Sequence, residues 1–386
     1  MRFAHLSDCH LGAWSSHPDL KELPAQAFEK AIDRCIAERV DFILISGDLF
    51  DNALPGIDVL RRAVIKLKQC KDNGIAIYTV AGSHDFSPTG KTFLSVLEDA
   101  GLIENVKFEE NGKVKLNFIK DATGAKIAGI VGRKGALEKD YFENLEESSE
   151  DGFKIFMFHS AVKEFRGFED TTALPLTLLP KGFDYYASGH VHDYSVNDFN
   201  GKKVVFPGVL FPTNFQELEK YDSGFYIVEV NDSIEIKRVE IRLNDVVLVK
   251  VNANGKSPMQ VENEIVEKTE KEDIKNAILL LKVEGCLENG KPSDIDFKNI
   301  TSLAADALTV KKNTSKLTSK EFEEVAVKSV AIEEIEKEII KNHGKPYGED
   351  FIFALMNVLQ EEKLEDETSH TYDDRIKSNV KKVLGI

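Results

Sequence analysis

The first hundred residues alternate between short apolar runs and helical patterns, and this alternation limits the fold more than any other feature of the chain. Buried strands are predicted where apolar residues follow one another, in RFAHLSD, DFILISGD and IAIYTVAG. Apolar residues recur at helical spacing between these runs, first at Phe28, Ala31, Ile32, Cys35 and Ile36 and then at Ile57, Leu60, Val64 and Leu67. A third helix, KTFLSVLEDAGL, ends at Gly101. This order predicts an α/β fold with parallel strands and crossover helices.

Three domains are predicted along the chain. Residues 1–245 form one α/β domain, because strand-like runs continue from about residue 105 to 226. These runs are KVKLNFI, KIAGIVG, FKIFMFHS, FDYYASGH, KKVVFPG and GFYIVEV. Residues 246–312 have the pattern of a small α+β unit, and residues 313–386 are predicted to form a linker and a helical element.

The helical element is expected after the hydrophilic stretch KKNTSKLTSKE, where Thr318 and Glu321 have the spacing of a capping box. An apolar stripe then follows along a Glu/Lys-rich helix, at Phe322, Val325, Ile332, Ile335 and Ile339. FIFALMNVL predicts a second helix and RIKSNVKKVLGI a third. Two roles are open for the stripe: contact with a partner, or packing on FIFALMNVL.

Five short motifs with Asp or His each follow a predicted strand. They are Asp8-x-His10, Asp48 in SGDLFD, Ser83-His84-Asp85, His159 in MFHS, and His190-x-His192 in SGHVHD. In open α/β sheets, ligands bind beyond the carboxyl ends of the strands, so the five loops can converge on one edge. One D-x-H or H-x-H alone is weak evidence, and SGDLFD alone fits a solvated turn. Five such motifs at strand ends predict a shared site.

Aspartate and histidine together are the ligands of Mn²⁺, Fe, Zn²⁺ or a similar metal. Asp48 has two carboxylate oxygens and can bridge two ions. Two ions about 3.5–4 Å apart are the usual device for hydrolysing phosphate esters. With Asp8 and Asp48 as the only anionic ligands of six, a pair of divalent ions keeps a net positive charge, which favours a phosphodiester.

The overall charge and the cysteines exclude some classes of protein. The formal net charge of −16 argues against a protein that coats nucleic acid over its whole surface, although a local basic groove remains compatible with it. The four cysteines, Cys9, Cys35, Cys70 and Cys286, lack paired spacing, so reduced thiols are expected. No apolar stretch is long enough to span a membrane, and MRFAHLSDCH does not resemble a signal peptide, so a cytoplasmic protein is expected.

At these motifs the chain resembles the calcineurin-like metallophosphoesterases, whose pattern is D-x-H, G-D, G-N-H-[DE], H and G-H-x-H. More narrowly, residues 1–230 are similar to the archaeal DNA double-strand break repair nucleases of the meiotic-recombination-eleven family, which are related to the bacterial SbcD exonucleases. The narrower likeness rests on FAHLSDCHLG, DFILISGDLFD, LEDAGLI, YYASGHVH, FPG and GFYIVEV.

The resemblance implies a four-layer sandwich, two Mn²⁺ ions and a small capping domain that helps hold DNA. It also implies a homodimer and a C-terminal helical element that binds a Rad-fifty-type coiled-coil ATPase. The residues implied for one metal are Asp8, His10, Asp48 and His192, and those for the other are Asp48, His159, His190 and the residue at position 83. His84 is implied as the catalytic residue that stabilises the transition state or protonates the leaving oxygen. His17 matches a histidine near the DNA path.

Two residues depart from the family pattern. Ser83 stands where the family has asparagine, and its shorter hydroxyl is a poorer ligand, which predicts a weaker second metal. Asp51 stands where some members have histidine, and an aspartate at this place resembles the SbcD pattern. Asp85 has two open roles, orienting His84 or capping a turn. His5, inside the first strand, is expected to be a core histidine with its hydrogen bonds satisfied.

The leading hypothesis is a Mn²⁺-dependent DNA exonuclease and endonuclease that acts in double-strand break repair with the ATPase. One alternative is a phosphodiesterase for nucleotides or other small molecules, which would need neither added domain. The other is a weakly catalytic scaffold that binds DNA and its partner, because of Ser83.

Overall fold

The computed structural model describes residues 1–87, 92–133, 135, 137–146, 150–166, 173–321, 348–359, 361 and 369–384. The chain divides into two compact units. The first comprises Met1–Ala253, Met259–Gly285 and Ile295–Leu317, and the second comprises Asn254–Pro258, Cys286–Asp294 and Thr318–Ile386. The boundaries expected at residues 245 and 312 both fall inside segments of the first unit, so the division into three domains stays a prediction.

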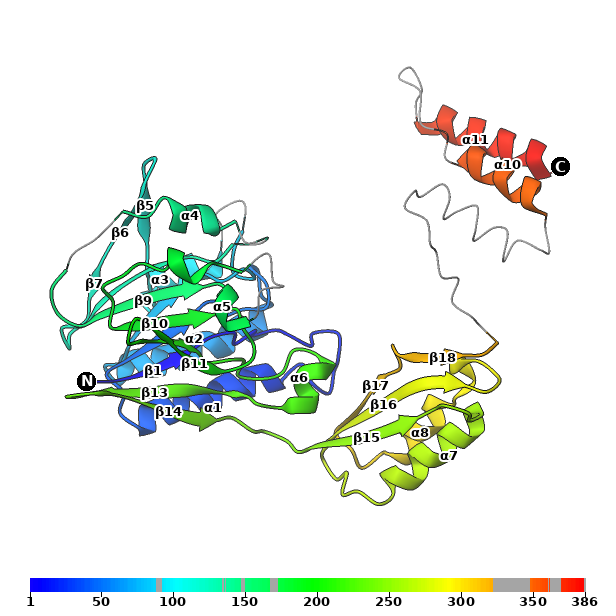
Figure 1. The fold of residues 1–386 in the computed structure, drawn as a ribbon, viewed down its shortest axis with the longest axis horizontal. Coiled ribbons are helices and arrows are strands. Elements are labelled where there is room, and N and C mark those ends of the chain that lie inside the picture. Colours follow the sequence, from blue (N-terminus) through cyan, green and yellow to red (C-terminus); the bar gives the residue numbers. More distant parts are fainter. Residues whose placement is uncertain are drawn as a thin grey trace. The chain divides into compact units, whose positions relative to one another are not determined.

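The first sheet has the strand order β14-β13-β1-β2-β3-β4, and the neighbouring strands β14, β13 and β1 are labelled in Figure 1. Its strands are β1 (Arg2–Leu6), β2 (Phe42–Ser46), β3 (Ala76–Val80), β4 (Glu104–Asn105), β13 (Gly224–Val230) and β14 (Ile234–Glu240). β1 to β4 are parallel, as the strand–helix alternation predicts, and β13 and β14 extend the sheet in antiparallel pairing.

The second sheet has the order β11-β12-β10-β9-β8-β7. Its strands are β7 (Ile119–Lys120), β8 (Lys126–Ile130), β9 (Lys154–His159), β10 (Tyr185–Gly189), β11 (Ser195–Phe199) and β12 (Lys202–Phe206). β5 (Phe108–Glu110) and β6 (Val114–Leu116) form a separate antiparallel pair. The prediction of one strand over KVKLNFI is therefore wrong, because its first part pairs in β6 with β5 and its last part pairs in β7 with β8.

Three apolar clusters separate four layers. Strand β2 contributes to two of these clusters, because successive side chains of a strand point to opposite faces of the sheet. Phe42 and Leu44 lie in the cluster between the sheets, whereas Ile43 and Ile45 lie in the cluster under the helices that cover the first sheet. A third cluster covers the outer face of the second sheet. The result is the helix–sheet–sheet–helix sandwich that the resemblance implies.

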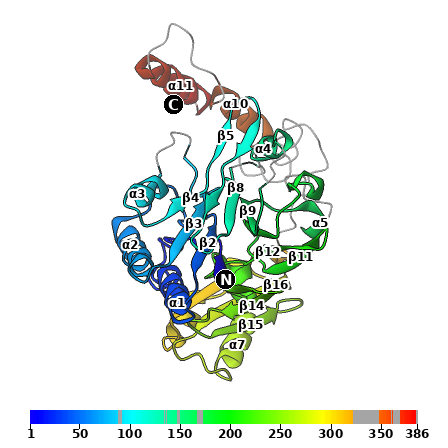
Figure 2. The ribbon, with the colours of Figure 1, turned by 90° about the vertical axis from the view of Figure 1, so that its left-hand side faces the viewer.

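The helices of this sandwich lie on its two outer faces, with α1, α2 and α3 on one side of the sheets and α5 on the other (Figure 2). They are α1 (Leu23–Ala37), α2 (Ile57–Asp72), α3 (Phe93–Asp99), α4 (Lys139–Glu143), α5 (Lys163–Arg166) and α6 (Phe215–Lys220), with the short 3-10 turn η2 (Leu176–Leu178). The predicted apolar residues of α1 account for its position, because Phe28, Ile32 and Cys35 are all fully buried. All four cysteines are free thiols.

A smaller four-stranded sheet follows, with α7 between β15 and β16 and α8 between β16 and β17. Its elements are β15 (Val246–Asn252), α7 (Pro258–Thr269), β16 (Ile278–Leu287), the 3-10 turn η3 (Pro292–Asp294), α8 (Phe297–Leu303), β17 (Thr309–Asn313) and β18 (Leu317–Ser319). β16 pairs in parallel with β15 and with β17. This agrees with the α+β unit expected from residue 246.

The hydrophilic stretch KKNTSKLTSKE is not a plain linker, because the end of β17 and all of β18 lie within it. Thr318 belongs to β18 instead of starting a helix. The N–H of Glu321 donates to Ser319 Oγ, and its carboxylate accepts from the N–H of Gly290. The capping-box interpretation of Thr318 and Glu321 is therefore wrong.

The C-terminal helices α10 (Glu349–Leu359) and α11 (Ser369–Leu384) pack against each other. They correspond to the two helices predicted there, whereas the apolar stripe from Phe322 to Ile339 lies outside the described residues. Within the described part of the chain, no helix has the length and apolar character needed to cross a membrane.

Candidate metal centre

The five predicted motifs follow β1, β2, β3, β9 and β10, at the carboxyl ends of these strands. Three groups of side chains bring one donor atom per residue within 4.8 Å of one another. They are Asp8, His10 and His192; His10, Asp48 and His84; and Asp8, Asp48 and His159. Because the groups share members, they form one continuous cluster, as the five-motif pattern predicts.

His10 and His192 have the geometry of two ligands to one ion. Their Nε2 atoms are 3.1 Å apart. His192 Nδ1 donates to Glu217 at 2.8 Å, so the neutral ring has its lone pair on Nε2. Asp8 Oδ1 lies 3.8 Å from the same Nε2. Asp8, His10 and His192 can therefore hold a cation together.

The second half of the cluster contains a buried nitrogen that has no hydrogen-bond partner among the residues the structure describes. His159 Nδ1 donates to the carbonyl oxygen of Ser46 at 2.8 Å, which turns Nε2 toward the cluster. His159 Nε2 lies 3.1 Å from Asp48 Oδ2 without an aligned hydrogen bond. A cation beside both atoms would satisfy this nitrogen. The residues present therefore fit divalent ions on both sides of Asp48.

Four of the predicted ligands have a left-handed backbone. The φ angles are 49° at Asp8, 43° at His10, 51° at Asp48 and 75° at His190. This conformation costs a non-glycine residue on the order of 1–3 kcal/mol and persists where the surrounding structure imposes it, often at functional sites. Here the turn directly after each strand brings the side chain back over the sheet edge.

Two glycines of the motifs make room for the cluster. A Cβ atom at Gly82 would lie 2.2 Å from Asp48 Oδ1, and one at Gly47 would lie 2.1 Å from His159 Nδ1. Gly47 also has a φ of 90°. Glycine is therefore required before Ser83 for reasons of space, and before Asp48 for reasons of both space and conformation.

The charges of Asp48 and His159 are strongly coupled. Burial opposes the ionisation of Asp48, but His159, His10 and the N–H of His84 together outweigh burial and hold the pKa of Asp48 below its usual value. Burial also disfavours protonated His159, yet Asp48 raises the pKa of His159 to about 10. A proton on His159 thus compensates buried carboxylate charge, a role that a divalent cation fills when His159 is a neutral ligand.

His190 approaches the cluster differently from the other five predicted ligands. Its backbone N–H donates to both carboxylate oxygens of Asp8, at 3.1 Å each. Its ring packs edge-on against the ring of His159, with centroids 5.2 Å apart. Among the described residues, the imidazole of His190 enters none of the three groups of close donor atoms. Burial and the nearby His159 lower the pKa of His190, which favours the neutral form that a metal ligand needs.

Ser83 and His84 are held against Asp48 by the third loop. The N–H of His84 donates to Asp48 Oδ1 at 2.7 Å, and Ser83 Oγ lies 3.5 Å from Asp48 Oδ2. His84 Nδ1 donates to the carbonyl oxygen of Asp51 at 2.7 Å, which leaves Nε2 free to face a substrate. Its side chain is 45% exposed. His84 is therefore the accessible histidine of the cluster.

Asp51 and Asp85 support these loops in separate ways. Asp51 Oδ1 lies 3.2 Å from His10 Nδ1 without an aligned hydrogen bond, and the carbonyl oxygen of Asp51 accepts from His84 Nδ1, so Asp51 contacts both rings and orients His84. The buried carboxylate of Asp85 accepts backbone N–H groups from Gly82, Leu49 and Phe50, at 3.0–3.1 Å. Asp85 thus connects the third loop to the second through backbone hydrogen bonds. Of its two predicted roles, these bonds support capping a turn and not orienting the ring of His84.

The remaining histidines of the domain lie outside the three groups. His17 packs beside Trp14, with ring centroids 5.2 Å apart. His5 is fully buried, with Nδ1 facing Tyr185 Oη and Nε2 facing Ser46 Oγ and the carbonyl oxygen of Ser188. His5 is thus the satisfied core histidine that its position in β1 predicts.

Sequence reasoning missed Glu217, which accepts the hydrogen bond from His192. Glu217 lies 25 residues after His192, on a helix that carries none of the five motifs. The only hint in the sequence is Asn214, whose side chain caps the start of α6. Such a cap predicts the helix but not which of its acidic residues faces a histidine.

Comparisons with known proteins identify the family of the chain. The family of calcineurin-like phosphoesterases matches residues 1–194. The DNA double-strand break repair protein Mre11 of Methanococcus maripaludis is 26% identical, over 98% of this chain and 100% of that protein. Mre11 of Archaeoglobus fulgidus is 26% identical, over 92% of this chain and 84% of that protein. Mre11 of Sulfurisphaera tokodaii is 29% identical, over 70% of each chain.

Proposed function

The chain belongs to the calcineurin-like phosphoesterase family, and from that premise we propose that it is a Mn²⁺-dependent DNA nuclease that acts in double-strand break repair. The supporting observation is the cluster of Asp8, His10, Asp48, His159 and His192 at the ends of parallel strands. The similarity to proteins named for double-strand break repair extends over nearly the whole chain, including the small sheet and the C-terminal helices. A phosphoesterase acting only on small esters would need neither of these parts.

The proposal assigns each side chain a role. Asp8, His10, Asp48 and His192 hold one ion, and Asp48, His159 and His190 hold the other, with Ser83 beside it. When bound, two divalent ions would polarise the phosphodiester and lower the pKa of a water molecule. The carboxylate of Asp48 supports this division because it lies between the imidazoles of His10 and His159, at 3.9 and 3.1 Å.

His84 would act on the substrate directly. The carbonyl oxygen of Asp51 fixes the proton on Nδ1, so Nε2 is the atom directed at a substrate. When the imidazole is protonated, Nε2–H can donate to a phosphate oxygen as negative charge develops there, or to the leaving oxygen. Its exposure supports contact with a substrate as large as DNA.

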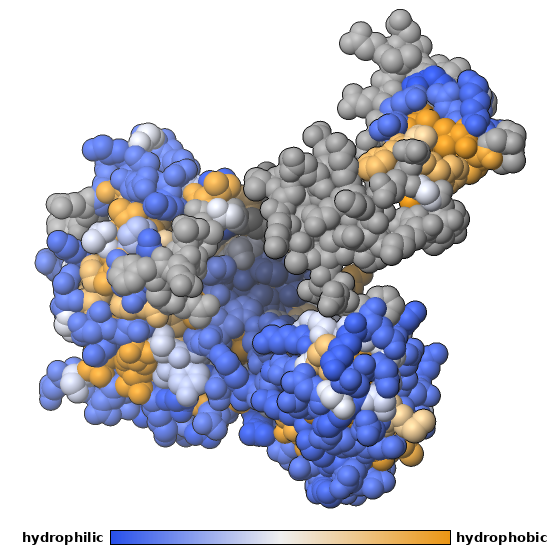
Figure 3. Space-filling model, turned by 45° about the vertical axis from the view of Figure 1, so that its right-hand side comes forward, coloured by the Kyte–Doolittle hydropathy of each residue, from blue (hydrophilic) through white to orange (hydrophobic). Residues whose placement is uncertain are grey.

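Two contacts with other proteins belong to the proposal. Helices α10 and α11 present an apolar face, seen as an orange patch on the C-terminal helical pair (Figure 3), and Leu359 and Leu384 are 58% and 44% exposed. We assign this face to a coiled-coil ATPase of the Rad-fifty type.

Helices α2 and α3 expose Ile57 and Val96, at 82% and 53%, and we assign that surface to a homodimer. Light scattering at micromolar concentration tests the dimer, and a monomer would contradict it.

The experiment that tests the enzymatic proposal is cleavage of single- and double-stranded DNA and of a small phosphodiester, each with Mn²⁺. The Asp48→Asn protein, purified in the same way, serves as the control for contaminating nuclease. We expect the unaltered protein to cut DNA and the variant to be inactive. Cleavage of the small ester but never of DNA would favour the small-molecule phosphodiesterase instead.

A weakly catalytic scaffold is a second candidate, because Ser83 has no amide oxygen to offer a second ion and lies 3.5 Å from Asp48 Oδ2. DNA binding without Mn²⁺-dependent cleavage would support it.

A further inference from the structure

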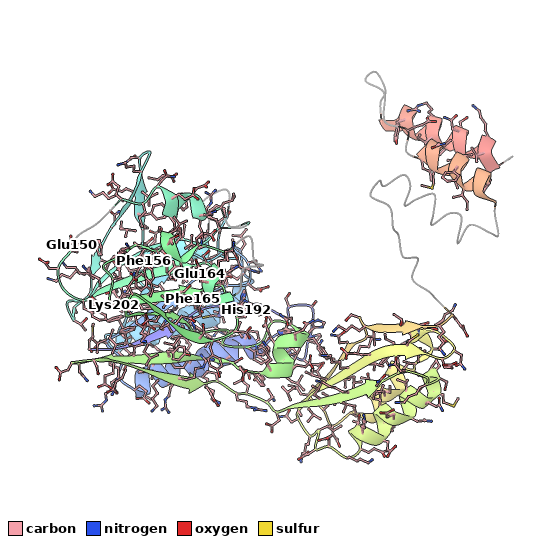
Figure 4. All side chains as sticks on the ribbon, viewed as in Figure 1. Glu150, Phe156, Glu164, Phe165, His192 and Lys202 are labelled. Atoms are coloured by element: carbon pink, nitrogen blue, oxygen red, sulfur yellow. The ribbon has the colours of Figure 1, made fainter. Side chains whose placement is uncertain are left out.

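Helix α6 lies between the metal cluster and the small sheet, within one compact unit. His192 is on the side of the two-sheet domain where α6 is found (Figure 4). Glu217, in the middle of this six-residue helix, accepts the Nδ1 proton of His192 at 2.8 Å. This bond fixes the tautomer and the ring plane of His192, so its Nε2 atom is directed at Asp8 and His10.

The carboxylate of Glu217 is itself held firmly. Oε2 accepts from the backbone N–H of Thr213 at 2.7 Å and from its hydroxyl at 3.0 Å. Oε1 accepts from Asn214 Nδ2 at 2.5 Å in addition to His192. Both oxygens are therefore used, and the side chain has little freedom to turn.

The opposite side of α6 contacts the small sheet. Glu219 binds Lys282 of β16 at 2.9 Å and lies 3.4 Å from Lys250 of β15. Residues two apart on a helix point about 200° away from each other, which explains how Glu217 and Glu219 reach opposite neighbours. The side chains of Glu219 and Lys282 are 14% and 21% exposed, so this pair is shielded more than most ion pairs of the described surface.

A second connection joins the same ion's ligands to the small sheet. Trp14 follows His10 by four residues, and its Nε1 donates to the carbonyl oxygen of Pro212, directly before Thr213, at 2.7 Å. The ammonium group of Lys311, on β17, lies 5.3 Å from the centre of the Trp14 ring. The loops that carry His10 and His192 are thus both linked to the small sheet, one by Trp14 and one by α6.

We propose that Glu217 is a positioning residue that fixes His192 at the metal centre, and that Glu219 couples this position to the small sheet through Lys282. The inference rests on the proposed metal site. Coupling of this kind is reciprocal: if the contact with the small sheet strengthens metal binding, metal binding strengthens that contact equally.

The first test measures Mn²⁺ binding directly, by calorimetry on the full chain, for Glu217→Gln. Glutamine has one acceptor oxygen where the glutamate has two, so it cannot accept from His192 and Thr213 together. We expect Mn²⁺ affinity at one of the two sites to fall about 10–100-fold. Gln216→Ala, an exposed neighbour on the same helix, is the matched control and should bind as the unaltered protein does. Unchanged affinity in a folded Glu217→Gln protein would overturn the proposal.

The second test measures the coupling. Amide hydrogen exchange in β16 should slow when Mn²⁺ is added to the unaltered protein and to Gln216→Ala, but not to Glu217→Gln or Glu219→Gln. Equal slowing in all four proteins would show that α6 does not carry the coupling. Since neither readout involves DNA, a protein that binds Mn²⁺ in this manner but cuts no DNA would refute the proposed function and leave this inference standing.

Discussion

The Nε2 atoms of His10 and His192 lie 3.1 Å apart although 182 residues separate them in sequence. Carboxylates stand beside the other nitrogen of both rings, Asp51 at 3.2 Å from His10 and Glu217 at 2.8 Å from His192. When both rings are neutral and carry their proton on Nδ1, two lone pairs face each other, and either a shared proton or a cation beside both atoms removes their repulsion. Asp8 Oδ1, 3.8 Å from His192 Nε2, supplies a third donor atom for such a cation, so this pair of histidines marks the metal centre.

Mn²⁺ binding should strengthen as the pH rises above neutrality. In the metal-free protein Asp48 raises the pKa of His159 to about 10, above the usual value of 6.5. Mn²⁺ must displace that proton, so its apparent affinity should rise by up to about tenfold per pH unit between pH 6.5 and 8.5. Calorimetry in two buffers of different ionisation enthalpy would measure the proton released.

The same raised pKa affects the stability of the metal-free protein. A proton bound more tightly in the folded state stabilises that state fully below about pH 6.5, and the contribution is lost as the pH rises toward 10. The melting temperature of the EDTA-treated protein should therefore fall from pH 6.5 to 8.5. In His159→Asn this part of the fall should be absent, and an identical pH profile in that variant would contradict the assignment.

Replacing His84 should separate catalysis from metal binding. His84→Ala removes an exposed side chain whose backbone N–H still donates to Asp48, so the fold and Mn²⁺ affinity should be retained. The DNA cleavage rate should fall about 10²–10⁴-fold, the range for loss of an acid–base group. A rate within a few-fold of the unaltered protein would exclude His84 from the chemistry.

Replacing Ser83 with asparagine should strengthen the weaker of the two metal sites. An amide oxygen reaches further than the hydroxyl, which lies 3.5 Å from Asp48 Oδ2. We expect Ser83→Asn to tighten the second Mn²⁺ about tenfold, or about 1.4 kcal/mol, and to raise the cleavage rate. Ser83→Ala is the matched control and should do neither. Equal Mn²⁺ affinity and rate in the serine and asparagine proteins would mean that position 83 is not a ligand position.

Removing residues 322–386 should abolish association with the ATPase and leave Mn²⁺-dependent cleavage in place. The cut preserves β18 and the bond from Gly290 to Glu321, which the sequence alone would have placed in a linker. Pull-down with the ATPase and a DNA cleavage assay on the same preparation would check both parts. Loss of folding would show that the C-terminal helices belong to the core.

The sequence pattern predicted the α/β domain with parallel strands and the cluster because both depend on local patterns, whereas the four-layer sandwich was implied by the family resemblance. Each motif adjoins its own strand, and a strand's position in a parallel sheet brings its end to the common edge. Glu217 could not be predicted, since its contact with His192 depends on how a six-residue helix docks against the loop that follows β10. The hydrogen bond from His84 to the carbonyl oxygen of Asp51 could not be predicted either, because every residue has a backbone carbonyl and the sequence does not show which one accepts. β18 was missed because its polar residues resemble a linker.

The left-handed turns at Asp8, His10, Asp48 and His190 have a consequence for engineering. Backbone hydrogen bonds, such as those from Asp8 N–H to Gly47 and from His10 N–H to Asp48, hold these turns together. The direction in which each ligand leaves the chain is therefore set by the scaffold before an ion arrives. Exchanging one ligand side chain for another of similar length should therefore change which ion is preferred without changing the backbone of the loops. The sheet edge is a preorganised site whose ligands can be replaced one at a time.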